Sequence, residues 1–277
     1  LITWNAVENA EKYIVYQRTY NTSTKKYSNW KSIKTTTDLK YVDTTVKLGT
    51  TYSYAVKAVS GSVTSKYTAT KNMKYDVKPA VKVAVASNGV KVSWSTAANA
   101  TGYTVYSSTY NTKTKKWSNW TNRGTAKGNA TSWVDKNAKS GTYYKYTVRA
   151  RNNSVASSYN KNGASTLYLS QPKVKIANNA SGVKLSWNKI AGAKSYTIYR
   201  AEYVNGKWSN WKNMGTLQKN TTVSLVDKTV KSGVTYRYTV RAVNGKVAST
   251  YTASNTLMYL AQPKTTVKVV SNGINVS

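Results

Sequence analysis

Residues 227–242 read DKTVKSGVTYRYTVRA, and their pattern decides which fold the chain is expected to adopt. Apolar and polar residues alternate through the second half of this segment, as in a β-strand with one buried face. The buried face is expected to carry Tyr236, Tyr238, Val240 and Ala242. Gly233 supplies backbone freedom for a sharp corner before the strand, and Tyr236 is expected to bury its ring there with its hydroxyl bonded to the preceding turn.

The same unit occurs twice upstream, beginning at Asp135 and at Asp43, so that its period is 92 residues. A period of this length indicates tandem domains, each large enough to bury its own core. The first repeat begins within a strand pattern and is expected to lack its first strand. The expected domains are residues 1–76, 77–169 and 170–260, followed by the start of a fourth repeat at 261–277. The corner tyrosines are Tyr52, Tyr144 and Tyr236.

Prolines mark the expected joins between the repeats. Pro79, Pro172 and Pro263 each fall just after the last strand pattern of a repeat, and proline is poorly tolerated inside a sheet. No glycine- and serine-rich spacer accompanies them, so we expect short, semi-rigid linkers. No segment shows a helical period, and the sequence therefore predicts an all-β fold class.

Composition restricts the functions that the chain can have. It holds no cysteine and no histidine, so disulfides, thiolate or imidazole metal sites and the commonest general base are absent. No apolar run reaches the about 20 residues of a membrane span. With 42 Lys and Arg residues against eight Asp and Glu residues, the net charge is +34, which favours polyanionic partners. We expect a protein that is not an enzyme and has no cofactor, metal site or membrane span.

The recurring carboxylates Asp43, Asp135 and Asp227 are the alternative, catalytic interpretation. They occur once per repeat, so no two of them are expected to form an acid and base pair. Each precedes a turn in which an aspartate accepts hydrogen bonds from backbone amides. These carboxylates are therefore expected to be structural.

Several of these motifs together resemble the fibronectin type III family. They are the tryptophan of the second strand, Trp94, the pair Tyr103 and Val105 on the third strand, and the aliphatic-x-x-G-x-x-Y-x-Y-x-V-x-A corner. The resemblance covers essentially the whole chain and implies three tandem immunoglobulin-like β-sandwiches plus a partial fourth repeat. The absence of phenylalanine and the presence of a Trp-Ser-Asn-Trp element depart from the family pattern.

The composition, rich in Lys, Thr, Ser, Asn and Tyr, also looks like that of modules from large secreted proteins of Gram-positive bacteria. In that setting the resemblance implies an extracellular, secreted or cell-surface location. Such modules serve as spacers, adhesive segments or accessory domains of polysaccharide-degrading enzymes, and are not enzymes themselves. A shared fold alone does not establish any of these functions.

The Trp-Ser-Asn-Trp element is the most distinctive candidate site. It occurs at residues 117–120 and 208–211, and as Tyr-Ser-Asn-Trp at 27–30. Positions three apart in an extended strand point to opposite faces, so we expect one tryptophan of each pair in the core and the other in solvent. An exposed ring beside asparagine and lysine can stack on a sugar or a base. The alternative is that both rings pack against protein. The candidate contacts are Trp30, Trp117, Trp120, Trp208 and Trp211.

A second candidate is the outer face of the sheet that holds the third and sixth strands. By alternation, this face carries Tyr106 with Arg149, Tyr199 with Arg237 and Arg241, and Tyr16 with Arg18 and Lys57. Cations between aromatic rings could bind a polyanion. The alternative is a solvated face stabilised by ordinary cross-strand pairs.

These observations leave two classes of function. The first is a non-catalytic extracellular array that acts as a spacer or adhesive segment and contacts anionic polysaccharide, cell-wall polymer or host glycoprotein. The second is a set of carbohydrate-binding accessory modules of a polysaccharide-degrading enzyme. Nucleic acid is disfavoured because the charge is diffuse and no recognition motif is present.

The two ends of the sequence suggest a possible self-association. Residues 262–277 repeat a linker and the first strand patterns, and stop before the expected tryptophan. One interpretation is that the segment belongs to a longer array. The other is that Ile274 and Val276 enter the core of the first repeat of another copy, which would build a head-to-tail filament.

Overall fold

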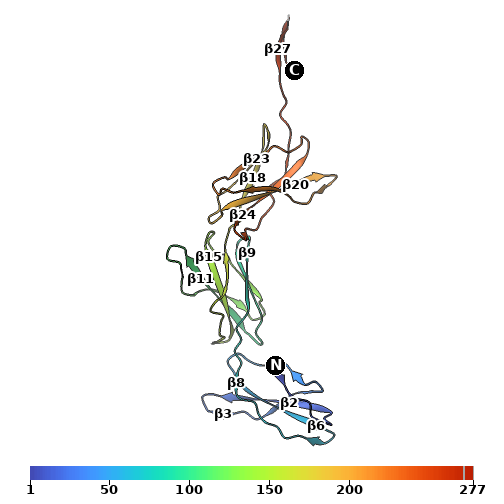
Figure 1. Cartoon of the computed structure of the whole chain (residues 1–277), viewed down its shortest axis with the longest axis vertical. Coiled ribbons are helices and arrows are strands. Elements are labelled where there is room, and N and C mark those ends of the chain that lie inside the picture. Colours follow the sequence, from blue (N-terminus) through green and yellow to red (C-terminus); the bar gives the residue numbers. More distant parts are fainter. Residues whose placement is uncertain (271, 277) are drawn as a thin grey trace. The chain divides into compact units, whose positions relative to one another are not determined.

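The computed structural model describes the backbone of residues 1–270 and 272–276, and the side chains of residues 1–269 and 272. Every helix or strand element in these ranges is a β-strand, which confirms the predicted all-β class (Figure 1). Each repeat is organised around two antiparallel strands of ten residues, namely β2 with β6, β11 with β15, and β20 with β24.

The first repeat places a short two-stranded sheet, β1 with β5, beside a six-stranded one. In the larger sheet β4, β2, β6 and β8 are the successive neighbours, and β3 and β7 are short edge pairs. The bounds are β1 (Ile2–Thr3), β2 (Lys12–Asn21), β3 (Lys26–Tyr27), β4 (Lys31–Thr36), β5 (Lys40–Tyr41), β6 (Thr51–Ser60), β7 (Val63–Thr64) and β8 (Met73–Lys74).

The second repeat shows the complete arrangement of seven principal strands in two sheets. The first, second and fifth of these form the three-stranded sheet β9-β10-β14, and the others form the second sheet, in the order β13-β11-β15-β17. The bounds are β9 (Val81–Ala86), β10 (Gly89–Trp94), β11 (Gly102–Asn111), β12 (Lys116–Trp117), β13 (Thr121–Lys127), β14 (Ser132–Asp135), β15 (Tyr143–Asn152), β16 (Val155–Ala156) and β17 (Ala164–Leu167).

The third repeat has the same strand order, with β18-β19-β23 as one sheet and β22-β20-β24-β26 as the other. Its bounds are β18 (Val174–Asn179), β19 (Gly182–Trp187), β20 (Ser195–Val204), β21 (Lys207–Trp208), β22 (Lys212–Leu217), β23 (Ser224–Asp227), β24 (Thr235–Asn244), β25 (Val247–Ala248) and β26 (Leu257–Met258). A final hairpin follows, formed by β27 (Val267–Val270) and β28 (Gly273–Val276). The side chains of Ile274 and Val276, to which the filament hypothesis assigns a role, lie outside the described residues.

By its packing, the chain divides into two compact units. One contains Leu1–Val83, Val92–Trp133 and Lys145–Ser165, and the other contains Ala84–Lys91, Val134–Tyr144 and Thr166–Ser277. Both units include strands of the second repeat. The domain boundaries predicted from the period, after residues 76, 169 and 260, therefore remain a proposal.

The cores of the second and third repeats are built from the inward residues that the alternation predicts. In the third repeat Leu185 of β19, Ile198 of β20 and Val240 of β24 are buried in one cluster, so the two sheets pack face to face. The indole of Trp187 packs against the ring of Tyr196 with 5.5 Å between the ring centroids. Burial of these aromatic rings contributes a large share of the hydrophobic stabilisation of so small a domain.

The tyrosine corner has the same geometry in all three repeats. The hydroxyl of Tyr236 accepts a hydrogen bond from the amide of Lys231 at 2.8 Å. Gly233, between them, has a φ of 81°, a value that side chains disfavour. Tyr144 accepts from Lys139 at 2.9 Å, and Tyr52 accepts from Lys47 at 2.8 Å. All three rings are buried, so this bond ties the turn to the start of the sixth principal strand.

Replacing Tyr144 with phenylalanine should destabilise the second repeat, because the amide of Lys139 loses its acceptor. We expect the free energy of unfolding to fall by about 1–2 kcal/mol. Hydrogen exchange of the amides of the second repeat, read by mass spectrometry, measures this change. Tyr159→Phe is the control, since it removes a hydroxyl from a half-exposed ring and should cost less than about 0.5 kcal/mol. Equal effects of the two substitutions would contradict the role of the corner.

Candidate functional site

The Trp-Ser-Asn-Trp element contains a β-bulge, which the sequence did not reveal. Trp117 pairs with Tyr110 of β11, and Thr121 pairs with Ser107 of the same strand. Three steps along β11 are therefore matched by four steps along the edge segment. The extra residue reverses the alternation of side chains, so Trp117 and Trp120 lie on the same face of the sheet.

The expectation that one tryptophan of each pair enters the core is therefore wrong. Trp120 is half-buried and Trp117 is 38% exposed, and both border the same lysine. The bulge occurs at the equivalent place in the other repeats. There the pairs are Tyr20 with Tyr27 and Gln17 with Lys31, and Tyr203 with Trp208 and Arg200 with Lys212.

One cation lies over the two aromatic rings of each element. In the second repeat it is Lys145, with Nζ 4.7 Å from the ring centroid of Trp117 and 5.5 Å from that of Trp120. In the third repeat the guanidinium of Arg237 lies 4.2 Å from the ring of Trp208 and 5.0 Å from that of Trp211. Such contacts hold both rings against the sheet, by cation–π attraction and by packing on the side-chain stem.

The first repeat supplies this cation from the opposite strand. There Arg18 of β2 lies 3.7 Å from the ring of Tyr27 and 4.4 Å from that of Trp30. Arg18 pairs with Ser53 across the ladder, whereas in the third repeat Arg237 of β24 pairs with Ala201. The small partner is fully buried in both cases. At this cross-strand position, one strand carries a cation and the opposite strand carries a small residue. The cation lies on β2 in the first repeat and on β24 in the third.

The exchange between strands can be tested in the third repeat. Arg237→Ser should lower its free energy of unfolding by about 1–2 kcal/mol, because Trp208 and Trp211 lose the cation between them. The double substitution Arg237→Ser with Ala201→Arg copies the first repeat and should recover most of that loss. Denaturation followed by tryptophan fluorescence measures both. Lys212→Ser, at an exposed position of β22, is the control, and failure of the double variant to recover stability would contradict the exchange.

The sequence analysis missed a second aromatic pair on the same face of the sheet. The rings of Trp120 and Tyr159 meet edge to face at 6.2 Å and 80°, and the guanidinium of Arg149 lies 5.6 Å from the tyrosine ring. The equivalent sets are Trp30, Tyr67 and Lys57, and Trp211, Tyr251 and Arg241. The signal in the sequence is a recurring Val-x-Ser-x-Tyr, which ends at Tyr67, Tyr159 and Tyr251.

The structure brings together some of the predicted outer-face residues and separates others. Tyr106 and Arg149 line one cavity of about 120 Å³, together with Trp120, Thr147 and Tyr159. In the first repeat Lys57 lies 5.9 Å from the ring of Tyr16. In the third repeat Tyr199 is half-buried on β20, while Arg237 lies over the tryptophans and Arg241 lies over Tyr251, at 5.7 Å.

The turn carboxylates bind groups of the fold. Asp227 accepts hydrogen bonds from the amide and hydroxyl of Thr229 and, at 2.9 Å, from the hydroxyl of Tyr238. Asp43 makes the same contacts with Thr45 and Tyr54. Asp135 accepts a hydrogen bond from the amide of Asn137 at 3.1 Å. These contacts fit the structural interpretation of the three aspartates.

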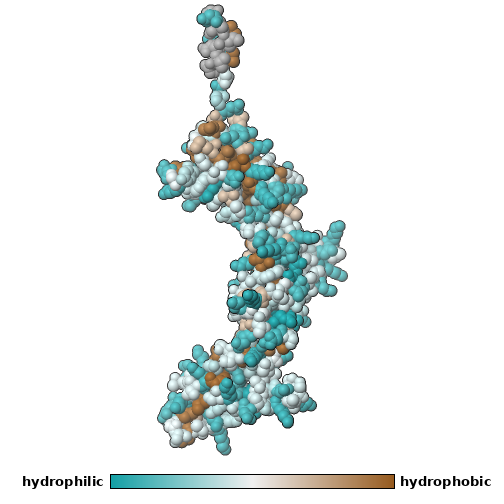
Figure 2. Space-filling model, turned by 180° about the vertical axis from the view of Figure 1, so that it is seen from behind, coloured by the Kyte–Doolittle hydropathy of each residue, from teal (hydrophilic) through white to brown (hydrophobic). Residues whose placement is uncertain are grey.

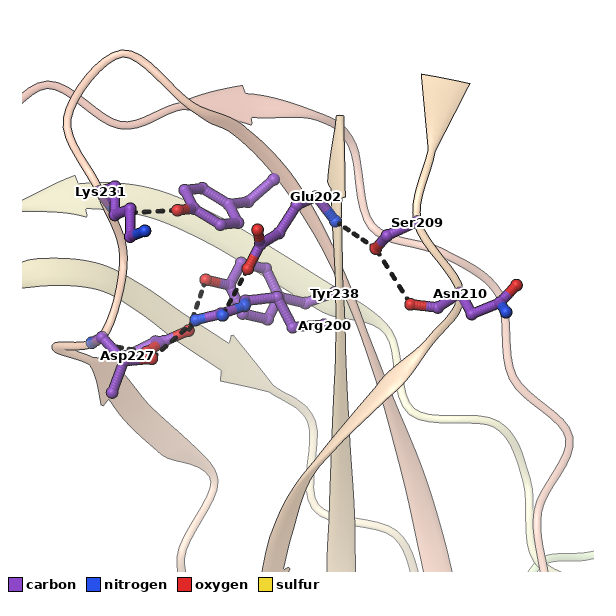
Figure 3. A network of polar contacts seen from close by, with 9 residues as sticks. Arg200, Glu202, Ser209, Asn210, Asp227, Lys231 and Tyr238 are labelled. Atoms are coloured by element: carbon purple, nitrogen blue, oxygen red, sulfur yellow. Dashed lines mark hydrogen bonds and ion pairs between the residues drawn. The ribbon is translucent and has the colours of Figure 1, made fainter. Parts of the chain in front are cut away.

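Arg200 forms a buried ion network that sequence analysis also missed (Figure 3). It is 5% exposed, and its guanidinium donates to Asp227 at 2.9 Å and to Glu202 at 2.5 Å. Burial raises the pKa of Asp227, but hydrogen bonds from Thr229, Arg200 and Tyr238 outweigh it and lower the pKa below 3.8. Burial and the Asp227 charge raise the pKa of Tyr238. The alternation after Tyr196 and Ile198, which directs position 200 inward, was the available signal.

The lowered pKa of Asp227 predicts how the third repeat responds to acid. Because the folded-state pKa lies below the unfolded value, the carboxylate contributes stability above about pH 4 and loses that contribution as pH falls through the folded pKa. Arg200→Gln reproduces the first repeat, where Gln17 donates to Asp43. The variant should lose less stability between pH 7 and pH 2.5 than the parent, in denaturation followed at both pH values. A loss equal to that of the parent would contradict the network's role.

In comparisons with known proteins, the chain matches solved structures. No protein-family model and no curated protein matches the sequence. Among solved structures, the FN1–FN3 domains of chicken CNTN1 are 15% identical with a TM-score of 0.30, over 92% of this chain and 91% of theirs. A two-domain fibronectin type III segment of chicken tenascin is 16% identical with a TM-score of 0.33, over 66% of this chain and 99% of its own. An Fn3-like protein from Clostridium thermocellum is 25% identical with a TM-score of 0.28, over 34% and 97%.

The chain is a tandem array of fibronectin type III-like β-sandwiches. This assignment rests on its own corner motifs and on the order of its strands, with the first, second and fifth together in one sheet. Within the described residues, no group of three or more acidic, cysteine or histidine side chains is placed to hold a metal ion. The same part of the chain contains no helix suited to crossing a bilayer.

Proposed function

We propose that the chain is a non-catalytic extracellular array, which acts as a spacer or adhesive segment and contacts anionic polymers through positive charge spread over its repeats. The observation that carries this proposal is a difference between the surroundings of the negatively and the positively charged side chains. Asp43 and Asp227 are surrounded by hydrogen-bond donors of the fold, whereas most lysines are exposed. Hydrophilic side chains cover much of the face seen in Figure 2 and are not gathered in one patch.

The tandem construction supports the spacer component of this function. The second and third repeats each pair their own strands into two sheets, and all three repeats have a tyrosine corner, so one structural unit is used repeatedly along the chain. A net charge of +34 over these repeats gives many weak contacts to a polyanion. Together these contacts favour attachment along a polymer over capture of a single small molecule.

Carbohydrate-binding accessory modules are the second candidate function, and one observation favours it. In each repeat a tryptophan and a tyrosine meet edge to face on the outer face of the sheet that holds the third and sixth strands. An Arg or Lys side chain lies beside them. Aromatic rings next to hydrogen-bond donors are suited to stacking on sugar rings. The two candidates differ in how binding responds to salt and to aromatic substitutions.

Binding to dextran sulfate tests the principal candidate. We expect affinity to fall steeply and log-linearly as salt rises, because each neutralised sulfate releases counterions. Titration at several salt concentrations, with uncharged dextran as the control ligand, measures the slope. An affinity that stays constant between low and physiological salt would contradict a diffuse electrostatic contact.

A further inference from the structure

The second repeat has a groove beside its aromatic cavity. The cavity of about 120 Å³ is lined by Tyr106, Trp120, Thr147, Arg149 and Tyr159. A larger groove of about 590 Å³ shares Arg149 and Tyr159 with it and adds Lys78, Lys161 and the polar residues Ser158, Asn160 and Asn162. A volume of this size is in the range of small-ligand sites, which combine aromatic walls with a few polar groups.

The groove is strongly basic. Arg149 is held in place by a hydrogen bond from Nε to the carbonyl of Ser157 at 2.6 Å. Arg149 is half-buried and lines both the groove and the aromatic cavity, and this bond directs its guanidinium along their shared wall. Lys78 and Lys161 are exposed on the same groove. The nearby carboxylate of Asp76 accepts hydrogen bonds from the amide and the hydroxyl of Ser158, which favour its ionised form, and it interacts electrostatically with Lys78. Arg149, Lys78 and Lys161 still outnumber it, so the positive charge prevails at the groove.

The third repeat keeps the aromatic part of this site and only one of its three cations. Trp211, Tyr251 and Arg241 reproduce the contacts of Trp120, Tyr159 and Arg149. In sequence, however, Gln171 replaces Lys78 and Ala253 replaces Lys161. The side chain of Gln171 also bonds to Thr250 at 3.3 Å and to Thr252. Two of the three cations of the groove are therefore particular to the second repeat.

We propose that this groove binds an acidic sugar residue, that is, a pyranose ring that carries a carboxylate. The ring packs against Trp120 and Tyr159, and the carboxylate lies between Arg149, Lys78 and Lys161. A guanidinium and two ammonium groups are opposite in charge to a carboxylate and offer it hydrogen-bond donors, and the aromatic rings match the apolar face of a sugar. The proposal rests on the proposed contact with anionic glycans and specifies one site and one ligand chemistry.

A tetrasaccharide of mannuronate, titrated into the whole chain at about 0.15 M salt, is the probe for this site. Binding should shift backbone amide signals of the second repeat. The double variant Lys78→Gln with Lys161→Ala, which gives the groove the residues of the third repeat, should weaken binding by about tenfold or more. Lys82→Gln with Lys91→Ala removes the same charge from exposed positions of β9 and β10, and should weaken it by less than about twofold.

Three results would overturn the site. They are equal weakening by the two double variants, equal binding of the neutral mannotetraose, and equal binding of inorganic tripolyphosphate. Titration with dextran sulfate at low salt separates failure of this site from failure of the proposed function. The diffuse contact with dextran sulfate should survive in the Lys78→Gln, Lys161→Ala variant. If the parent chain does not bind dextran sulfate, the proposed function fails, whatever the mannuronate titration shows.

Discussion

The pairing of the third and sixth principal strands is the constraint on which the rest of each repeat depends. In the third repeat β20 and β24 pair continuously from Ser195–Val243 to Tyr203–Thr235. One face of this ladder supplies Tyr196, Tyr238 and their neighbours to the core. The other face carries the cations and rings of the candidate site. Their positions along the strands are fixed by the register, because side chains alternate between the two faces. A shift of one residue would exchange the two faces.

The bulge in the edge segment is a local exception to this alternation, and it creates the outer aromatic surface. An additional residue between Trp117 and Thr121 brings both tryptophans to the same side. Such a surface of half-exposed rings would be poorly fixed alone. The cation at the neighbouring cross-strand position contacts both rings, and the repeats provide it from either strand, as Arg18 and Arg237 show. The first and third repeats thus share one cation and one small residue at the same cross-strand position, although the strand that carries the cation differs.

Opposite charges have different roles in this chain. Asp227 is 5% exposed and surrounded by donors, because an aspartate in this turn is stable only when its oxygens are hydrogen-bonded. In the third repeat the buried Arg200 neutralises it, and in the first repeat the uncharged Gln17 takes that place. Most lysines, by contrast, are exposed, and the sequence holds only eight Asp and Glu residues for 42 Lys and Arg residues. This excess of exposed positive charge is the basis of the proposed contact with anionic polymers.

Local patterns in the sequence were sufficient for the fold. The corner motif ending in Tyr236 and the alternation through Val240 depend only on neighbouring residues, and period-two alternation is a strong local signal. The placement of Trp117 and Trp120 was not accessible in this way, because it depends on one unpaired residue in the ladder with β11. Tyr159 and Lys161 belong to a segment far in sequence from Trp120 and Tyr106. Only the antiparallel pairing of the tertiary structure brings those segments together and makes an aromatic and basic site from residues that are unremarkable one by one.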